Sequence, residues 1–215
     1  MTGQVVTESE RSMARILLRL GAVSVNAKQP FVYASGVRSP IYTDNRILIS
    51  YPDEREWVID ALARRISERL GTDNVDVVAG TATAGIPFAA WVADRLRKPL
   101  IYVRSAPKEH GTGNLIEGRL RPGQRTVVIE DLITTGGSSL NTVDAIQQAE
   151  GIVSHCFALF TYGFERARSG YQQRGVTAET LATISTLLDV AVDERFIQPE
   201  DRREVEAWLA SQQSA

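Results

Sequence analysis

The residues best suited to chemistry lie in one segment, VVIEDLITTGGS, at positions 127–138. Its apolar start predicts a buried strand, and its glycines predict a turn that opens a helix near Ser138. Glu130 and Asp131 offer carboxylates that accept hydrogen bonds from neighbouring hydroxyls of a sugar. The turn can direct backbone N–H groups at a phosphate, and the N-terminal end of a helix favours the same anion. The segment therefore predicts a site for a phosphorylated sugar.

The phosphate half of this predicted site has further donors, since Thr134, Thr135 and Ser138 add hydroxyls to the turn. Ligands of open α/β sheets bind at the carboxyl ends of the strands, where this segment is expected. The alternative is an ordinary strand-to-helix turn beside a solvated pair of acids. Other phosphate motifs fit worse, because the chain has no G-x-x-x-x-G-K-[ST] sequence and its other glycines miss the dinucleotide-binding spacing.

A second candidate anion loop follows the apolar run at 75–79. It reads GTATAGIP over residues 80–87, and its small residues would let backbone amides approach an anion at a helix N-terminus. The alternative is a plain turn of small residues. The residues assigned to this loop are Thr81, Ala82, Thr83, Ala84 and Gly85.

A third candidate is the long polar stretch at 104–118, which carries Arg104, Lys108 and His110. A connection of this length in a compact domain is typical of a lid over an active site. Cations on such a lid suit a substrate with a multiply charged leaving group. The alternative is a solvated basic loop without a role in chemistry.

The elements that must position these residues alternate along the chain. Apolar runs without a polar face predict buried parallel strands at 75–79, 100–103, 126–129 and 156–160. Helical patterns at 52–70, 86–97 and 138–150 separate most of them. This alternation predicts an α/β fold, with a parallel sheet flanked by helices.

Three regions are expected from this pattern. Residues 1–50 are predicted to form an N-terminal helix and a turn-rich segment, and residues 51–190 the α/β core. Residues 191–215 are predicted to form a helical tail that packs on the core or on the N-terminal segment.

Composition narrows the classes of function. A formal net charge of −2 gives no reason to expect binding to nucleic acid or to a membrane. No apolar run is long enough to span a bilayer, and the N-terminus does not resemble a signal peptide. The single cysteine, Cys156, lies in a predicted buried strand and is expected to be structural. We therefore expect a soluble, cytoplasmic protein without a structural zinc site.

Residues 127–138 resemble the binding motif for phosphoribosyl diphosphate (PRPP) of type I phosphoribosyltransferases. The resemblance implies that Glu130 and Asp131 hold the ribose hydroxyls and that residues 134–138 hold the 5-phosphate. It implies a type I fold, in which a small hood subdomain built from the termini accompanies the parallel sheet. The PRPP-binding residues so implied are Arg104, Lys108, His110, Glu130, Asp131, Leu132, Ile133, Thr134, Thr135, Gly136, Gly137 and Ser138.

The lid sequence R-x-x-x-K-x-H-G, followed by G-N-x-I-E-G, resembles the catalytic loop of orotate phosphoribosyltransferases. In that family the loop closes over the active site of the other subunit of a homodimer. Arg104, Lys108 and His110 match positions that contact the diphosphate. The chain departs from the family's frequent pattern at Ser105 and Ala84, where many members carry lysine.

Residues 31–42 resemble the hood segment of the same family, F-x-x-x-S-G-x-x-S-P-x-Y. Thr134 matches a position that touches orotate in relatives, and Tyr42, Arg38 and Arg46 offer the aromatic wall and the cations that a planar anionic base needs. The alternative is that the segment only packs. Relatives also carry cations at positions occupied here by Ala34 and residues 161–163, so the group that binds the orotate carboxylate stays open.

The implied reaction joins the ribose 5-phosphate of PRPP to orotate and releases pyrophosphate. Asp131, Arg104, Lys108 and His110 are the residues implied to act in catalysis, with Mg²⁺ on the phosphates and no protein side chains assigned as its ligands. Two alternatives are a phosphoribosyltransferase specific for a purine and a regulator that senses PRPP. Known regulators add a DNA-binding domain or a basic RNA-binding face, which the negative net charge disfavours.

Overall fold

The computed structural model describes residues 6–26, 29–32, 38–106 and 114–213, with only the backbone described at 213. The helices and strands follow in this order: α1 (Glu8–Arg19), β1 (Val23–Val25), β2 (Phe31–Val32), β3 (Arg38–Ser39), β4 (Ile41–Thr43), η1 (Asn45–Ser50), α2 (Pro52–Leu70), η2 (Thr72–Asn74), β5 (Val77–Thr81), α3 (Gly85–Leu96), β6 (Leu100–Val103), β7 (Ile116–Glu117), β8 (Arg125–Ile133), α4 (Gly137–Gln148), β9 (Ile152–Thr161), α5 (Glu165–Gln173), β10 (Thr177–Thr183), α6 (Ile184–Asp193) and α7 (Pro199–Gln213).

The central sheet has the strand order β10-β9-β8-β5-β6-β7. All neighbours are parallel except β6 and β7, which pair antiparallel. After β5 the chain adds β6 on one side, and it then returns to place β8 on the other side. The loops that leave β5 and β8 therefore diverge, and a ligand-binding crevice is expected between them.

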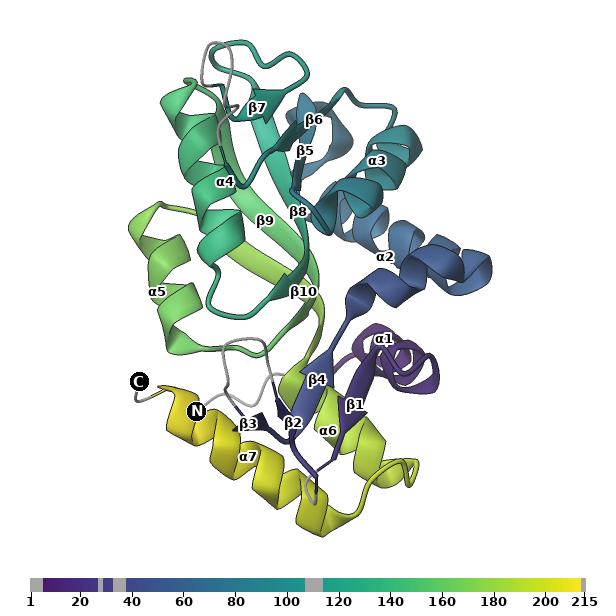
Figure 1. The fold of residues 1–215 in the computed structure, drawn as a ribbon. Helices are drawn as coiled ribbons and strands as arrows, with labels where there is room; N and C mark the ends of the chain where they lie inside the picture. Colours follow the sequence, from purple (N-terminus) through teal and green to yellow (C-terminus); the bar gives the residue numbers. More distant parts are fainter. Residues whose placement is uncertain (1–5, 27–28, 33–37, 107–113, 214–215) are drawn as a thin grey trace.

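Alternate residues of the strands face two apolar layers. Val127 and Ile129 face the layer that includes buried residues of α2 and α3, whereas Val128 faces the layer that includes residues of α4 and α5. Figure 1 shows these helix pairs on opposite sides of the sheet. Both faces are covered, which explains why the strands read as continuous apolar runs. The predicted α/β fold with a parallel sheet between helices is confirmed.

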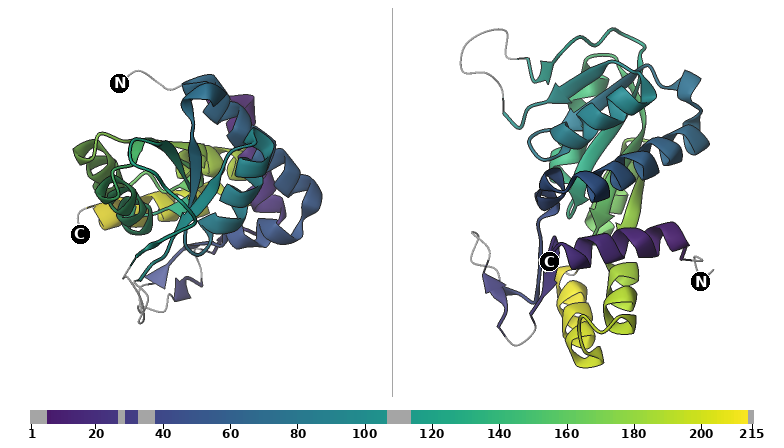
Figure 2. Two further views of the ribbon diagram at one scale, coloured as in Figure 1. Left: turned by 90° about the horizontal axis from the view of Figure 1, so that it is seen from above. Right: turned by 90° about the vertical axis from the view of Figure 1, so that its right-hand side faces the viewer.

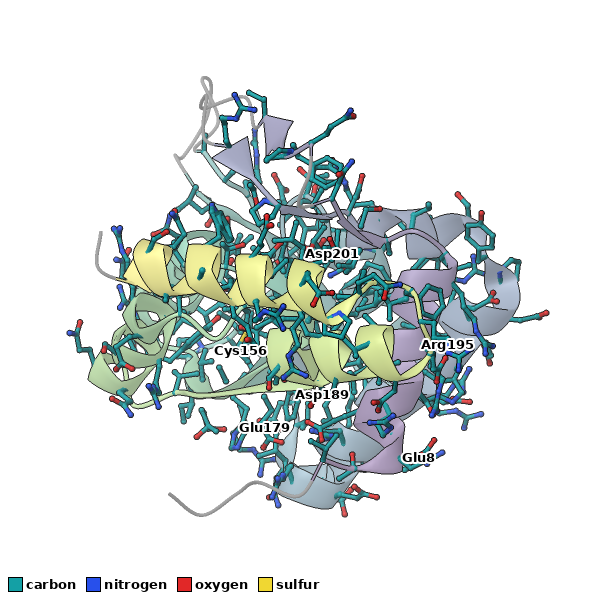
Figure 3. The ribbon with its side chains drawn as sticks, turned by 90° about the horizontal axis from the view of Figure 1, so that it is seen from below. Glu8, Cys156, Glu179, Asp189, Arg195 and Asp201 are labelled. Carbon is teal, nitrogen blue, oxygen red and sulfur yellow. The ribbon has the colours of Figure 1, made fainter. Side chains whose placement is uncertain are left out.

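The first and last elements of the described chain lie together at one end of the sheet (Figures 1 and 2). Strand β1 pairs antiparallel with β4, and β2 with β3. Figure 3 shows α6 and α7 side by side, and Arg202 of α7 forms an ion pair with Asp189 of α6 at 2.7 Å. The indole Nε1 of Trp208 donates to the backbone carbonyl of Arg38 at 3.0 Å, so α7 contacts the N-terminal segment. We name α1, β1–β4, η1, α6 and α7 the terminal elements.

Several predicted boundaries were wrong. Strand β5 begins and ends two residues later than expected, and β8 continues for four residues past the predicted end at 129. Helices α3 and α4 each begin one residue earlier than predicted. Helix α3 ends one residue earlier than predicted, and α4 ends two residues earlier. Strand β10 was not predicted, and the expected loop at 104–118 ends in β7. The acid pair therefore lies within a strand instead of after it.

Cys156 is fully buried on β9, and burial raises the pKa of its thiol to about 12, which agrees with a structural role. Within the described ranges, every helix is too short or too polar to traverse a bilayer.

Candidate functional site

A cavity of about 280 Å³ opens at the carboxyl ends of β5 and β8, at the point where the strand order reverses. It brings together residues from three separate parts of the sequence: the end of β4 with the start of η1, the loop after β5, and the end of β8 with the first turn of α4. The residues that line it are Thr43, Asp44, Arg46, Ala82, Thr83, Ala84, Glu130, Asp131, Leu132 and Ser138.

The acid pair forms the floor of this cavity. Glu130 is buried, with 5% of its surface exposed, and the backbone N–H of Asp131 donates to its Oε1 at 3.1 Å. Burial is the main cause that raises the pKa of Glu130 well above its ordinary value, and the neighbouring charge of Asp131 acts in the same direction. Burial also raises the pKa of Asp131. A ligand that donates hydroxyl hydrogen bonds would relieve the unfavourable burial of these carboxylates.

The loop after β5 forms the wall opposite the terminal elements. Its backbone includes a cis peptide bond between Ala82 and Thr83. Gly85, the first residue of α3, packs so closely on β8 that an added Cβ would lie 2.6 Å from the carbonyl oxygen of Ile129. Only glycine fits at this contact, and it brings the start of α3 against the acid pair. The hydroxyl of Thr81 is buried and has no hydrogen-bond partner among the described atoms.

The turn after β8 is the predicted phosphate loop. Gly136 has a φ of +81°, which glycine adopts readily, and α4 begins at Gly137. Thr135, Gly137 and Ser138 are exposed, and their groups are accessible to a ligand. Behind the turn, the Ser139 hydroxyl donates to the carbonyl oxygen of Gly136 at 3.2 Å, and it lies 2.6 Å from the phenol oxygen of Tyr171 on α5. The turn therefore leaves Thr135, Gly137 and Ser138 open to solvent, while the hydrogen bond from Ser139 holds its backbone at Gly136 against the core.

Residues between β4 and η1 form the third wall of the cavity, and two long-range hydrogen bonds fix them. The Thr43 hydroxyl lies 2.8 Å from the phenol oxygen of Tyr162, which follows β9. The Asn45 side-chain amide donates to the backbone carbonyl of Asp131 at 2.7 Å. Next to these anchors, Arg46 donates to both carboxylate oxygens of Asp44 at 2.6 and 2.8 Å. This hydrogen bond lowers the pKa of Asp44, so the carboxylate is charged.

The other predicted site residues lie around this cavity or outside the described chain. Arg104 follows β6 and pairs with Glu117 at 3.7 Å, while Lys108 and His110 lie outside the described residues. Tyr42 and Arg38 are exposed on β4 and β3, and the Tyr42 ring lies 5.7 Å from that of Phe31. Neither Tyr42 nor Arg38 lines the cavity. Ile133 instead borders a larger hollow of about 940 Å³ along β10 and α5.

Sequence reasoning missed Asp44 and Asn45 as site residues. Both belong to a turn-rich stretch whose local pattern predicts no contact with β8, more than 80 residues later in the chain. The one available signal was the run Asp44-Asn45-Arg46, in which three polar residues interrupt apolar neighbours on both sides.

Comparison with known proteins agrees with this geometry. Residues 53–185 match the family model described as "Phosphoribosyl transferase domain". The orotate phosphoribosyltransferase of Listeria monocytogenes is 46% identical over 199 residues, covering 93% of this chain and 94% of the relative. That of Enterococcus faecalis is 44% identical over 203 residues, covering 94% and 96%. The crystal structure of orotate phosphoribosyltransferase from Aeropyrum pernix superposes with a TM-score of 0.71 at 31% identity, covering 86% of this chain and 99% of that one. The chain belongs to the phosphoribosyltransferase family, in the group of the orotate phosphoribosyltransferases.

Proposed function

We propose that this chain is a pentosyltransferase that transfers the 5-phosphoribosyl group of PRPP to orotate, giving orotidine 5′-phosphate and pyrophosphate for pyrimidine synthesis. The observation that carries the proposal is the position of the acid pair. Glu130 and Asp131 lie at the reversal point of the sheet, directly before a glycine turn that opens α4. A ribose 5-phosphate needs this combination, since its hydroxyls donate to carboxylates and its phosphate accepts from backbone N–H groups.

In this assignment the ribose lies over β8. Glu130 and Asp131 accept hydrogen bonds from its 2- and 3-hydroxyls, and residues 134–138 bind its 5-phosphate. Leu132 and Ile133 hold the acid pair and the turn in register, because β8 is paired with β9 through both residues. As the bond to pyrophosphate breaks, positive charge develops on the sugar, and the carboxylate of Asp131 stabilises it.

The leaving pyrophosphate requires positive charge. We assign this charge to Arg104, Lys108, His110 and a Mg²⁺ ion, and the loop after β5 (Thr81–Gly85) provides backbone N–H groups. Among the described residues, no group of three or more His, Cys, Asp or Glu side chains could hold a metal. Mg²⁺ keeps phosphate and water oxygens and needs at most one or two carboxylates of a protein. The ion would neutralise the charge that accumulates on pyrophosphate.

The base and the second subunit complete the assignment. Orotate is planar and anionic, and we assign its contacts to Thr134, Tyr42 and Arg38, the last two on strands of the terminal elements. We also assign a homodimer in which residues 104–118 complete the site of the partner subunit. Arg104, at the start of that segment, is paired with Glu117 at 3.7 Å in the single chain.

A direct assay tests the function. The purified protein is mixed with Mg²⁺, PRPP and orotate, and the loss of orotate absorbance is followed. Parallel reactions with adenine, hypoxanthine, xanthine and uracil test the choice of base. Among the bases tested, we expect turnover only with orotate. Turnover with a purine and none with orotate would assign the chain to another base, and PRPP binding without any turnover would indicate a sensor.

A further inference from the structure

We propose that Arg46 binds the pyrophosphate group of PRPP, as a cation supplied from the terminal elements to the wall of the PRPP site. The proposal rests on the proposed function, because it assigns a residue to the leaving group of that reaction. Within the described part of the chain, Arg46 is the one cationic side chain that lines the cavity at β5 and β8. The same cavity contains three carboxylates, those of Asp44, Glu130 and Asp131.

The position of Arg46 is fixed by the residues that precede it. Thr43 is hydrogen-bonded to Tyr162 at 2.8 Å, and Asn45 is buried and donates to the Asp131 carbonyl at 2.7 Å. The backbone that leads into Arg46 is therefore held against the ends of β8 and β9, and Arg46 itself belongs to η1. Its charge also acts on the acid pair, because Arg46 is one of the groups that lower the pKa of Asp131.

The guanidinium group is available to exchange its partner. The Arg46 side chain is 61% exposed, and its partner Asp44 is 32% exposed. An ion pair with this much solvent contact contributes little stability, whereas pyrophosphate offers several charged oxygens that match the planar donors of arginine. We expect the guanidinium to leave Asp44, or to share its donors, when the anion enters the cavity.

The geometry of the ribose site selects pyrophosphate among the anionic groups of the reactants. With its hydroxyls over Glu130 and Asp131 and its 5-phosphate on the turn before α4, the sugar directs its C1 substituent away from that turn. The other lining residues include Arg46 on one wall and the small residues Ala82, Thr83 and Ala84 on the facing wall, and the small residues leave space for a bulky anion. The small residues carry no charge, so Arg46 is the group that can balance the charge of pyrophosphate there.

The test compares Arg46→Ala and Arg46→Lys with the wild type in both directions of the reaction. In Arg46→Ala we expect the KM values of PRPP and of pyrophosphate to rise at least about tenfold, as for the loss of one charge-assisted hydrogen bond, while the KM of orotate stays within about twofold. Arg46→Lys should recover part of the loss. Arg19→Ala, which removes an exposed arginine of α1 away from the cavity, is the matched control and should leave all three constants unchanged.

A charge placed on the opposite wall should rescue the variant. We expect Ala84→Lys, added to Arg46→Ala, to lower the KM of pyrophosphate again, because position 84 lines the same cavity. Calorimetric titration with pyrophosphate gives a second measurement that needs no turnover. It therefore remains decisive if the wild type proves inactive with orotate, a result that would overturn the proposed function and not the role of Arg46.

Two outcomes would overturn the role of Arg46. One is an unchanged pyrophosphate affinity in Arg46→Ala, and the other is a rise confined to the KM of orotate. If Arg46→Ala does not fold, Asp44→Asn provides the test, because it removes the competing carboxylate and should tighten pyrophosphate binding. Weaker or equal binding in folded Asp44→Asn would contradict the proposal.

Discussion

The side-chain amide of Asn45 donates a 2.7 Å hydrogen bond to the backbone carbonyl of Asp131, and so joins the terminal elements to the acid pair. Asn45 is fully buried, and its own Oδ1 has no hydrogen-bond partner among the described atoms. This hydrogen bond therefore fixes the peptide bond between Asp131 and Leu132. The residue that fixes it, Asn45, is 86 positions away in the sequence.

Replacing Asn45 with alanine should destabilise the protein and weaken PRPP binding together. The Asp131 carbonyl would lose its donor inside the protein, at a cost of about 1–3 kcal/mol, and the acid pair would lose its support. Thermal unfolding and the KM of PRPP measure the two effects. The matched control is Asn74→Ala, which removes an exposed amide that donates to Leu70, and should leave the KM of PRPP unchanged. A stability loss without a change in that KM would show that the bond does not position the acids.

Tyr171→Phe should loosen the phosphate turn from behind. The phenol hydroxyl can donate to Ser139, which in turn donates to the carbonyl of Gly136, so the series fixes the peptide that directs the Gly137 N–H outward. Loss of one buried hydrogen bond costs about 1 kcal/mol, and we expect the KM of PRPP to rise by a few fold. In a double-mutant cycle with Ser139→Ala the two losses should not add. Additive losses would mean that the two hydroxyls act separately.

Glu130→Gln should make the protein more stable and less active near neutral pH. Burial raises the pKa of Glu130 well above its ordinary value of 4.5, so the folded state keeps a proton that the unfolded state releases. The stability from this proton is complete below about pH 4.5 and is lost as pH rises through the raised pKa. Glutamine does not titrate, so the variant does not lose this stability. The Tm of Glu130→Gln should therefore exceed that of the wild type by a margin that grows from acid to neutral pH.

The measurement is the Tm of both proteins between about pH 4.5 and 8, where a change of about 1 kcal/mol corresponds to roughly 2–4 °C for a chain of this size. Turnover should fall, since glutamine replaces one oxygen that accepts a hydrogen bond from a ribose hydroxyl with an NH₂ group. An advantage that is constant with pH would indicate that Glu130 does not titrate differently in the two states.

Lys108→Ala should lower kcat far more than it weakens PRPP binding. Lys108 lies outside the described residues, and this prediction depends on its place in the polar loop and on the family pattern. A cation that reaches the leaving group only in the transition state affects the rate more than the ground state. Loss of orotate absorbance gives kcat, and calorimetric titration gives the affinity for PRPP. Equal kcat in variant and wild type would remove the lid from the mechanism.

The strands that the sequence predicted correctly are those buried on both faces. Strands β5, β6, β8 and β9 each contain an apolar run, because helices cover them on each side. Edge strand β10 was missed because its sequence, TAETLAT, has only Leu181 and Ala182 buried, so neither an apolar run nor a clear alternation marks it. Its parallel pairing with β9 depends on backbone hydrogen bonds, which leave no trace in the side chains.

Helix α4 illustrates a smaller error. The predicted helix reached 150, but the left-handed residue after it is Glu150, with a φ of +62°, while Gly151 follows it with an N–H donated to Ile146. Glycine is required at 151 because an added Cβ would lie 2.7 Å from Ile146 Cγ2. The helix therefore ends two residues earlier than predicted, and the left-handed residue beyond it is not a glycine.

For the site, local sequence located the acid pair and both turns, because each is contiguous and lies beside a strand end. The contribution of residues 43–46 could not be predicted in this way. Their place depends on Asn45 and Thr43 bonding to partners 86 and 119 positions further along the chain. Contacts between residues so far apart arise only in the folded chain, and a short stretch of sequence contains no pattern that predicts them.

The contact between Trp208 and the Arg38 carbonyl has a consequence for biosynthesis. Helix α7 supports a strand near the start of the chain, yet a ribosome produces it after every other described element. The α/β core can complete its sheet earlier. In a newly made chain, β3 therefore gains this contact only after α7 has left the exit tunnel.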